Sequence, residues 1–294
     1  MTDSTAASGK RLPIVALAML GLACGQALAS QQDAELFSEQ KPLWEVGVGG
    51  FWGSLPDYPA SGETTSRSIA FPYLVYRGEY WRVGDDDERG AISRRFLRGD
   101  RFELDLTFSA AFPVDSEDNR AREGMPDLDY LVGVGPQLII KLINEPGRRE
   151  LNLNLQVRSI YSTDLSSINH RGYVFNPKLG YSQEHVTDLD LEVFTRVGPI
   201  FATEEMMDYF YEVSPEFATL ERPAYDAKAG YLGTYLTLGA TKRFNSRFRL
   251  FVGTQIGLHN GAANSDSPLF EEDLNLSFFS AFSWTFFHSD QPAR

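Results

Sequence analysis

Large apolar side chains alternate with small or polar ones near the end of the chain. From Leu274 to Phe286 nearly every second residue is large and apolar, and the residues between are mostly small or polar, Phe279 being one exception. Because successive side chains of a strand point to opposite faces, this segment has one aromatic face and one mostly polar face. The pattern predicts a two-faced strand, which a soluble sandwich or a membrane barrel could contain.

The same alternation recurs along the chain, and no segment of comparable strength shows a helical period. Two of the twelve predicted strands, 79–83 and 92–98, are short, and without them the number would be ten. The long stretch 202–228 also leaves room for a further strand pair around 209–213. The predicted strands span 43–52, 67–77, 79–83, 92–98, 101–112, 129–142, 149–161, 172–182, 188–201, 229–242, 247–258 and 273–287.

The connections between these strands alternate in length. The long ones are 53–66, 84–91, 113–128, 162–171, 202–228 and 259–272, and the others are tight turns rich in Gly, Pro, Asn or Asp. Short turns at one end and long loops at the other are typical of outer-membrane barrels. The fold class predicted is therefore all-β: a closed, up-and-down, antiparallel transmembrane β-barrel of about twelve strands.

The N-terminal residues indicate export. Basic residues precede an apolar run at 12–23, and a small-x-small motif ends at Ala29, so residues 1–29 are predicted to be a signal peptide cleaved before Ser30. The apolar run is too short for a spanning helix. Cys24, the only cysteine, leaves lipidation as an alternative, although Gly21 stands where a lipobox prefers Leu. The remaining segments are 30–42 before the barrel, the barrel itself at 43–287 and a tail at 288–294.

The charge of the chain disfavours one class of partner and suggests two surfaces. The mature part carries 39 acidic and 25 basic residues, which argues against nucleic-acid binding. Acidic residues gather in the predicted long loops, and basic residues gather in the short turns. A solvated loop, or a contact for cations or a basic partner, is predicted at Asp85, Asp86, Asp87 and Glu88. The candidate periplasmic partner surface is Arg148, Arg149, Arg243 and Arg247.

No catalytic, cofactor or metal site is predicted. The four histidines, including His259, are scattered without metal-ligand spacing and are interpreted as solvated loop residues. A serine hydrolase built from His259 with Ser265, Asp266 or Ser267 is a weaker alternative. The polar residues of the alternating strands are predicted to point inward, where their opposite charges would pair and narrow or plug the lumen. These are Glu103, Asp105, Asn152, Asn154, Gln156, Arg158, Asp190, Glu192, Arg196, Arg249 and Gln255.

Several short motifs resemble the MipA/OmpV family of outer-membrane proteins. They are the segment 56–61 (PDYPAS), followed by 71–73 (FPY), 209–214 (YFYEVS), 225–230 (YDAKAG) and 264–269 (NSDSPL). The chain departs from the family pattern at its end, because Phe287 is not terminal.

The resemblance implies a non-enzymatic protein of the Gram-negative outer membrane, in contact with its lipid and lipopolysaccharide. It further implies a scaffold that joins a lytic transglycosylase to a peptidoglycan synthase, with the basic turns and 30–42 as partner surfaces. The alternative is a narrow solute channel or a binder of cationic compounds such as antimicrobial peptides. Neither hypothesis predicts an oligomeric state.

Overall fold

A computed structural model describes residues 42–79, 81–83, 92–145, 147–186 and 191–293. The acidic residues Asp85, Asp86, Asp87 and Glu88, the cleavage site at Ala29 and Ser30, and Asp190 lie outside the described residues.

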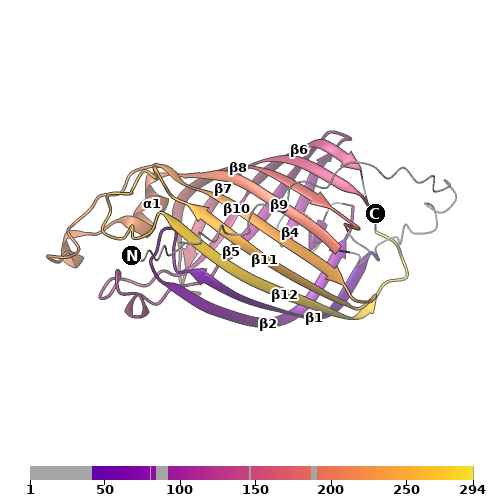
Figure 1. The fold of residues 1–294 in the computed structure, drawn as a ribbon, viewed down its shortest axis with the longest axis horizontal. Coiled ribbons are helices and arrows are strands. Elements are labelled where there is room, and N and C mark those ends of the chain that lie inside the picture. Colours follow the sequence, from indigo (N-terminus) through magenta and orange to yellow (C-terminus); the bar gives the residue numbers. More distant parts are fainter. Residues whose placement is uncertain (1–41, 80, 84–91, 146, 187–190, 294) are drawn as a thin grey trace, which may run out of the picture. The chain divides into compact units, whose positions relative to one another are not determined.

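Twelve antiparallel strands pair in chain order, and the last pairs with the first to complete a ring (Figure 1). The predicted all-β antiparallel architecture is confirmed. The strands are β1 (Trp44–Pro56), β2 (Thr64–Arg77), β3 (Trp81–Val83), β4 (Ile92–Arg98), β5 (Phe102–Ala111), β6 (Tyr130–Glu145), β7 (Arg149–Thr163), β8 (Ile168–Gln183), β9 (Leu191–Ala202), β10 (Gly230–Arg243), β11 (Phe248–Leu258) and β12 (Leu274–His288).

The alternation of short and long connections is also present, with one difference. The predicted long loop 162–171 is a tight turn, because β7 continues to Thr163 and β8 begins at Ile168. Asp164 holds this turn by accepting hydrogen bonds from the backbone N–H groups of Ser166 and Ser167 at 2.9 and 2.7 Å. These bonds stabilise the carboxylate and hold the pKa of Asp164 below its usual range.

The hypothesis of a strand pair around 209–213 is wrong. Residues Glu204–Tyr211 form the helix α1, and the structure also contains two short 3₁₀ helices, η1 (Ser116–Asp118) and η2 (Pro215–Phe217). Acidic residues in the first turn of α1 favour a helix N-terminus. Apolar residues at helical spacing give α1 a buried face: Met206, Met207, Tyr209, Phe210 and Tyr211. Within the described part of the chain, no helix has the length and apolarity needed to cross a bilayer.

The seam between β1 and β12 depends on a glycine. The strand register shifts between Val46 and Gly47, where a bulge interrupts the pairing with β12. A Cβ atom at Gly47 would lie 1.8 Å from the carbonyl oxygen of Trp284, so only glycine allows the two backbones to approach this closely.

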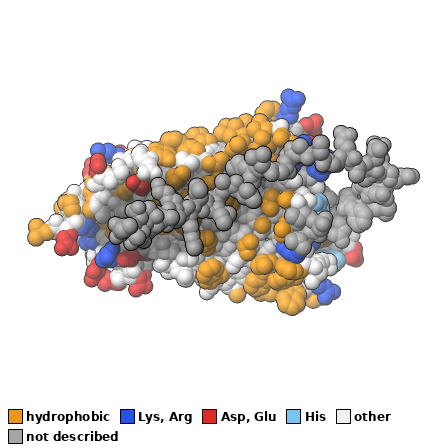
Figure 2. Space-filling model, in the orientation of Figure 1, with side chains coloured by type: hydrophobic (Ala, Val, Ile, Leu, Met, Phe, Trp, Pro, Cys, Tyr) orange, Lys and Arg blue, Asp and Glu red, His pale blue; other side chains and the backbone are white. Residues whose placement is uncertain are grey.

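The outer face of the ring is apolar. Figure 2 shows hydrophobic side chains over the strands, while many of the charged ones lie toward the two ends. A closed ring with an apolar outer belt matches the lipid-facing surface of a transmembrane barrel. Large exposed members of the belt include Trp44, Trp52, Leu74, Tyr76, Tyr173, Leu179, Val197, Leu238, Val252, Leu276, Phe278, Phe282, Trp284 and Phe286.

The inner face is largely polar, as predicted. Glu103 and Asp105 of β5 and Asn154 of β7 are at most 1% exposed, although no other layer covers the outer face of the described sheet. Burying this many polar groups is tolerable only when most of them find partners.

Candidate functional site

The end of the barrel with the long loops is closed by an apolar cap. Residues of α1 and the long loops pack against inward residues at the ends of β7 to β10, beside the α1 label in Figure 1. Met207 and Leu269 are completely buried. We call this cluster the cap: Tyr58, Val114, Leu128, Ile160, Val174, Ala202, Met206, Met207, Tyr209, Phe210, Tyr211, Val213, Ala227, Leu232 and Leu269.

Hydrogen bonds join the loops of the cap. The hydroxyl of Tyr58 donates to the Leu269 carbonyl at 2.9 Å, and that of Tyr211 donates to the Pro59 carbonyl at 2.8 Å. Burial raises the pKa of both tyrosines, so both hydroxyls keep their protons. Ser267 donates to the Tyr211 carbonyl at 2.8 Å. Three loops that are far apart in sequence are thereby fastened to one another.

Arg122 crosses the same cluster. Its guanidinium donates to the carbonyls of Phe210 and Pro126 at 3.3 and 3.1 Å and lies 5.8 Å from the centre of the Tyr58 ring. Burial lowers the pKa of this arginine. Carbonyl oxygens and an aromatic face therefore take the place that water would have around the charge.

The solvent side of α1 is acidic. Asp208 lies in the middle of the helix, and burial raises its pKa to about 6, helped by the nearby carboxylates of Glu212, Glu204, Asp226 and Glu205. The apolar face of α1 therefore stabilises the cap, whereas the carboxylates on its acidic face repel one another above pH 6.

His259 is not a solvated loop residue, contrary to the prediction. It is 0% exposed, its Nδ1 donates to the Leu232 carbonyl at 2.9 Å, and its ring packs edge-on against Tyr235 and Phe270. The loop folds inward at this point, and His259 closes the cap at the end of β11. In the described residues no serine or carboxylate hydrogen-bonds its ring, so the hydrolase alternative gains no support. The remaining histidines, His170, His185 and His288, are exposed.

Among the residues that the structure describes, no group of histidine, cysteine or acidic side chains could hold a metal ion.

Paired charges line the lumen wall at the end with the short turns. Glu45 of β1 accepts hydrogen bonds from Arg77 at 2.7 Å, Arg249 at 3.3 Å and Thr285 at 3.0 Å. The cluster also holds the chain where it enters the barrel, because Arg77 donates to the Pro42 carbonyl at 3.1 Å. It joins β1, β2, β11 and β12 across the seam. Arg77 itself is not among the residues that the sequence predicted to face inward.

Two further polar groups line the other side of the lumen. Lys141 and Glu103 form an ion pair at 2.6 Å. The amide of Gln156 donates to Thr107 and Gln137 at 2.9 and 2.8 Å. The prediction that polar residues face inward is confirmed for these strands, and the predicted charge pairing is present at Glu103.

Aromatic residues also face the lumen, which the sequence argument missed. The rings of Phe194, Phe251 and Phe279 stack in series with centroids 5.5 and 5.6 Å apart, on the inner faces of β9, β11 and β12. Ile69 and Phe71 share the inner face of β2 with Arg77 and are 46% and 40% exposed. The position of Phe279 on the polar face of its strand was the available signal.

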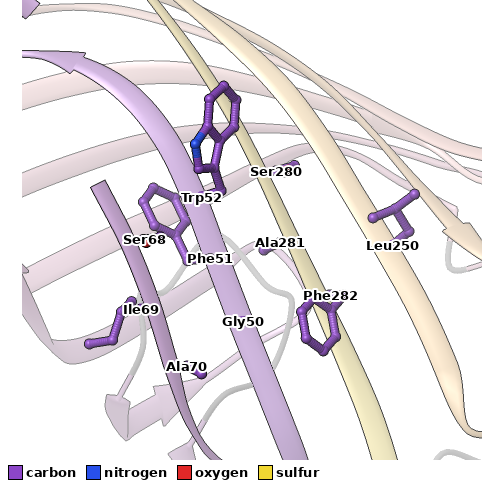
Figure 3. A pocket seen from close by; sticks show the side chains of 10 residues that line it. All are labelled: Gly50, Phe51, Trp52, Ser68, Ile69, Ala70, Leu250, Ser280, Ala281 and Phe282. Atoms are coloured by element: carbon purple, nitrogen blue, oxygen red, sulfur yellow. The ribbon is translucent and has the colours of Figure 1, made fainter. Parts of the chain in front are cut away.

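A shallow groove of about 290 Å³ crosses the outer face at the seam (Figure 3). Its floor contains Gly50, Ala70 and Ser280, between the larger side chains of Trp52 and Phe282. The groove lies within the apolar belt, where membrane hydrocarbon would cover it, so it is a poor candidate for a polar ligand.

The predicted basic surface is divided into two parts. Arg148 and Arg149 lie at the β6–β7 turn, Arg243 and Arg247 lie at the β10–β11 turn, and β8 and β9 separate the two hairpins in the ring. All four are exposed, but Arg149 forms a two-armed hydrogen bond with Glu145, both contacts being 2.9 Å. The charge of Arg149 is therefore partly neutralised.

The residues after the last strand contact the residues that precede the first strand. The N–H of Leu43 donates to the Gln291 carbonyl at 2.8 Å, and Pro42 bridges to Pro292. The two ends of the barrel sequence thus pair beside the seam.

An antiparallel ring with an apolar belt, a polar lumen and a cap at its long-loop end defines a transmembrane β-barrel protein whose lumen is covered at one end. Within this class, residues 46–286 match the family described as MltA-interacting protein MipA, and the chain belongs to that family. No curated protein sequence matches the chain.

Among solved structures, the chain is similar to the NanC porin, at 8% identity and a TM-score of 0.38, over 81% of this chain and 98% of that one. It is similar to the outer membrane channel DcaP of Acinetobacter baumannii, at 8% identity and a TM-score of 0.38, over 83% and 96%. It is also similar to LpxR from Salmonella typhimurium, at 11% identity and a TM-score of 0.39, over 82% and 90%. The family assignment rests on the sequence match alone.

Proposed function

We propose that this protein is a non-enzymatic barrel of the Gram-negative outer membrane that acts as a scaffold for murein-hydrolysing and murein-synthesising enzymes. The observation that carries the proposal is the cap, which covers the long-loop end with apolar residues and fixes three loops by buried hydrogen bonds. A barrel closed in this way is suited to presenting a surface rather than to passing solutes.

The family description supplies the kind of partner, because it names a protein that interacts with MltA. In the proposed orientation the short turns face the periplasm, where murein enzymes work. The exposed guanidinium groups of Arg148 and Arg247 would meet acidic groups of the partner from two separate hairpins. Rim charges of this kind mainly set the association rate and its dependence on salt.

The scaffold is tested by capture of purified lytic transglycosylase and peptidoglycan synthase on the refolded barrel. The variant R148Q/R247Q should bind with a slower association rate and a weaker salt dependence. R120Q is a matched control, since Arg120 is 82% exposed but lies in a long loop at the other end. Unchanged binding by R148Q/R247Q would remove the proposed surface, and no capture by the wild-type barrel would refute the scaffold.

A narrow channel or a binder of cationic compounds is the second candidate, and the exposed inward side chains of Ile69 and Phe71 favour it. Single-channel recording in a planar bilayer separates the two functions. The capped barrel should show no stable ion steps. Steps in the wild-type protein would support the channel and contradict the closed form of the scaffold.

A further inference from the structure

Arg158 is a basic side chain inside the barrel that has no carboxylate partner among the described residues. It lies on the inner face of β7, in line with Asn154 and Gln156, and is partly buried. Its one hydrogen bond among the described residues is from a terminal nitrogen to the hydroxyl of Ser109, at 2.8 Å. Its Nε is buried without a partner.

Three other basic residues of the lumen have carboxylate partners. Arg77 and Arg249 both meet Glu45, and Lys141 meets Glu103. A buried positive charge is costly unless a negative group or several hydrogen bonds compensate it. The single neutral hydroxyl of Ser109 compensates Arg158 only in part.

Arg158 lies between the apolar cap and a polar layer of the lumen. Val174 lies opposite Arg158 on β8, and Ile160 is the next inward residue on β7; both belong to the cap. Below it, Gln156 is already bonded to Thr107 and Gln137. Among the described residues, neither neighbouring layer hydrogen-bonds the guanidinium.

A glycine on β6 provides the room for this arrangement. A Cβ atom at Gly133 would lie 2.7 Å from the Ser109 hydroxyl and 3.4 Å from Cδ of Arg158. The arginine can cross β6 and reach Ser109 only because this side chain is absent.

We propose that Arg158 is the anchor of an oxyanion site in the lumen, just below the cap. The ligand would be a carboxylate or phosphate group of a small molecule, because two oxygens can bond the two terminal nitrogens of one guanidinium side by side. The hydroxyl of Ser109, which accepts a bond from Arg158, keeps its own proton to donate to the ligand. This site goes beyond the scaffold function and does not depend on it.

The test uses the full refolded barrel in detergent, with sodium phosphate and sodium benzoate as separate probes. Sodium chloride keeps the ionic strength constant, and binding is followed by titration calorimetry and by the thermal midpoint of unfolding. At least one probe should bind saturably and raise the midpoint. Binding of phosphate alone would identify phosphoryl groups as the ligand class, and binding of benzoate alone would identify carboxylates.

R158Q should weaken binding roughly 10- to 100-fold, the loss expected for a charged hydrogen bond. The affinity of R158K should lie between those of the wild type and R158Q, because lysine keeps the charge without the two-armed geometry. The matched control is R196Q, since Arg196 also faces the lumen but lies 4.5 Å over the Phe194 ring; it should bind like the wild type.

A second readout separates the site from a structural role. Without either probe, R158Q should be at least as stable as the wild type, because it removes an uncompensated charge. Added probe should then stabilise the wild type and leave R158Q unchanged. Equal effects of both probes and chloride on the wild type, or equal binding by R158Q, would overturn the proposal, and the wild-type titration decides it even if R158Q fails to fold.

Discussion

Glu45 should be the most sensitive polar residue of the barrel. It is 3% exposed and accepts hydrogen bonds from three strands, at 2.7 Å from Arg77, 3.3 Å from Arg249 and 3.0 Å from Thr285. Replacing Glu45 with alanine removes the carboxylate that Arg77 and Arg249 share. Arg77, which is 1% exposed, would then keep its charge beside a second arginine.

The expected loss in the free energy of unfolding is about 3–5 kcal/mol, the usual cost of removing one partner from a buried ion pair. E45Q should cost less than E45A, because its amide oxygen still accepts a hydrogen bond although the charge is gone. The loss should appear at the seam, since Glu45 lies on β1 and its partners lie on β2, β11 and β12.

Urea unfolding of the refolded barrel in detergent, followed by the electrophoretic shift between folded and unfolded forms, measures this loss. The control is E145A, which breaks the exposed ion pair with Arg149 and should have little effect. If E45A were no more destabilising than E145A, the cluster would not stabilise the seam and the reasoning would fail.

Three further predictions concern the seam and the cap. G47V should prevent seam closure, because its Cβ would lie 1.8 Å from the Trp284 carbonyl, and a lower yield of heat-resistant folded barrel would show this. M207D should open the cap by placing a charge at a position that is 0% exposed, and bilayer recording should then detect ion steps that M207L does not produce. D208N should stabilise the cap above pH 6 by up to about 1 kcal/mol after solvent screening, but not below pH 4. Slower proteolysis of the cap above pH 6 would show this. The sign follows because a pKa raised to about 6 favours the protonated folded state, so stability falls as pH rises from about 4 to 6; equal protection at both pH values would contradict it.

The sequence by itself determined the local structure of the barrel. A period of two persists only where a strand separates two environments, so β5, β7 and β12 could be located from their alternation within two residues of their ends. Turn residues and loop lengths then placed both ends of the strand series at the short-turn side. The resemblance of short loop motifs was enough to indicate the family to which residues 46–286 belong.

Alternation does not tell which aromatic residues face inward, because each strand offers two faces and lipid or lumen can accept an aromatic ring. Phe71, Phe194 and Phe251 line the lumen, where only polar residues were predicted from the sequence. The helix α1 was missed because eight residues in a long connection give a weak periodic signal compared with the strands around them.

The tertiary structure alone decided the cap, the burial of His259 and the cluster at Glu45. These contacts join residues far apart in sequence: Tyr58 with Leu269, His259 with Leu232, and Glu45 with Thr285 across 240 positions. Local pattern sets only which side chains share a face of one strand. Closure of the ring then decides which of those faces meet, and hence which polar groups find a partner and why Arg158 meets no carboxylate among the described residues.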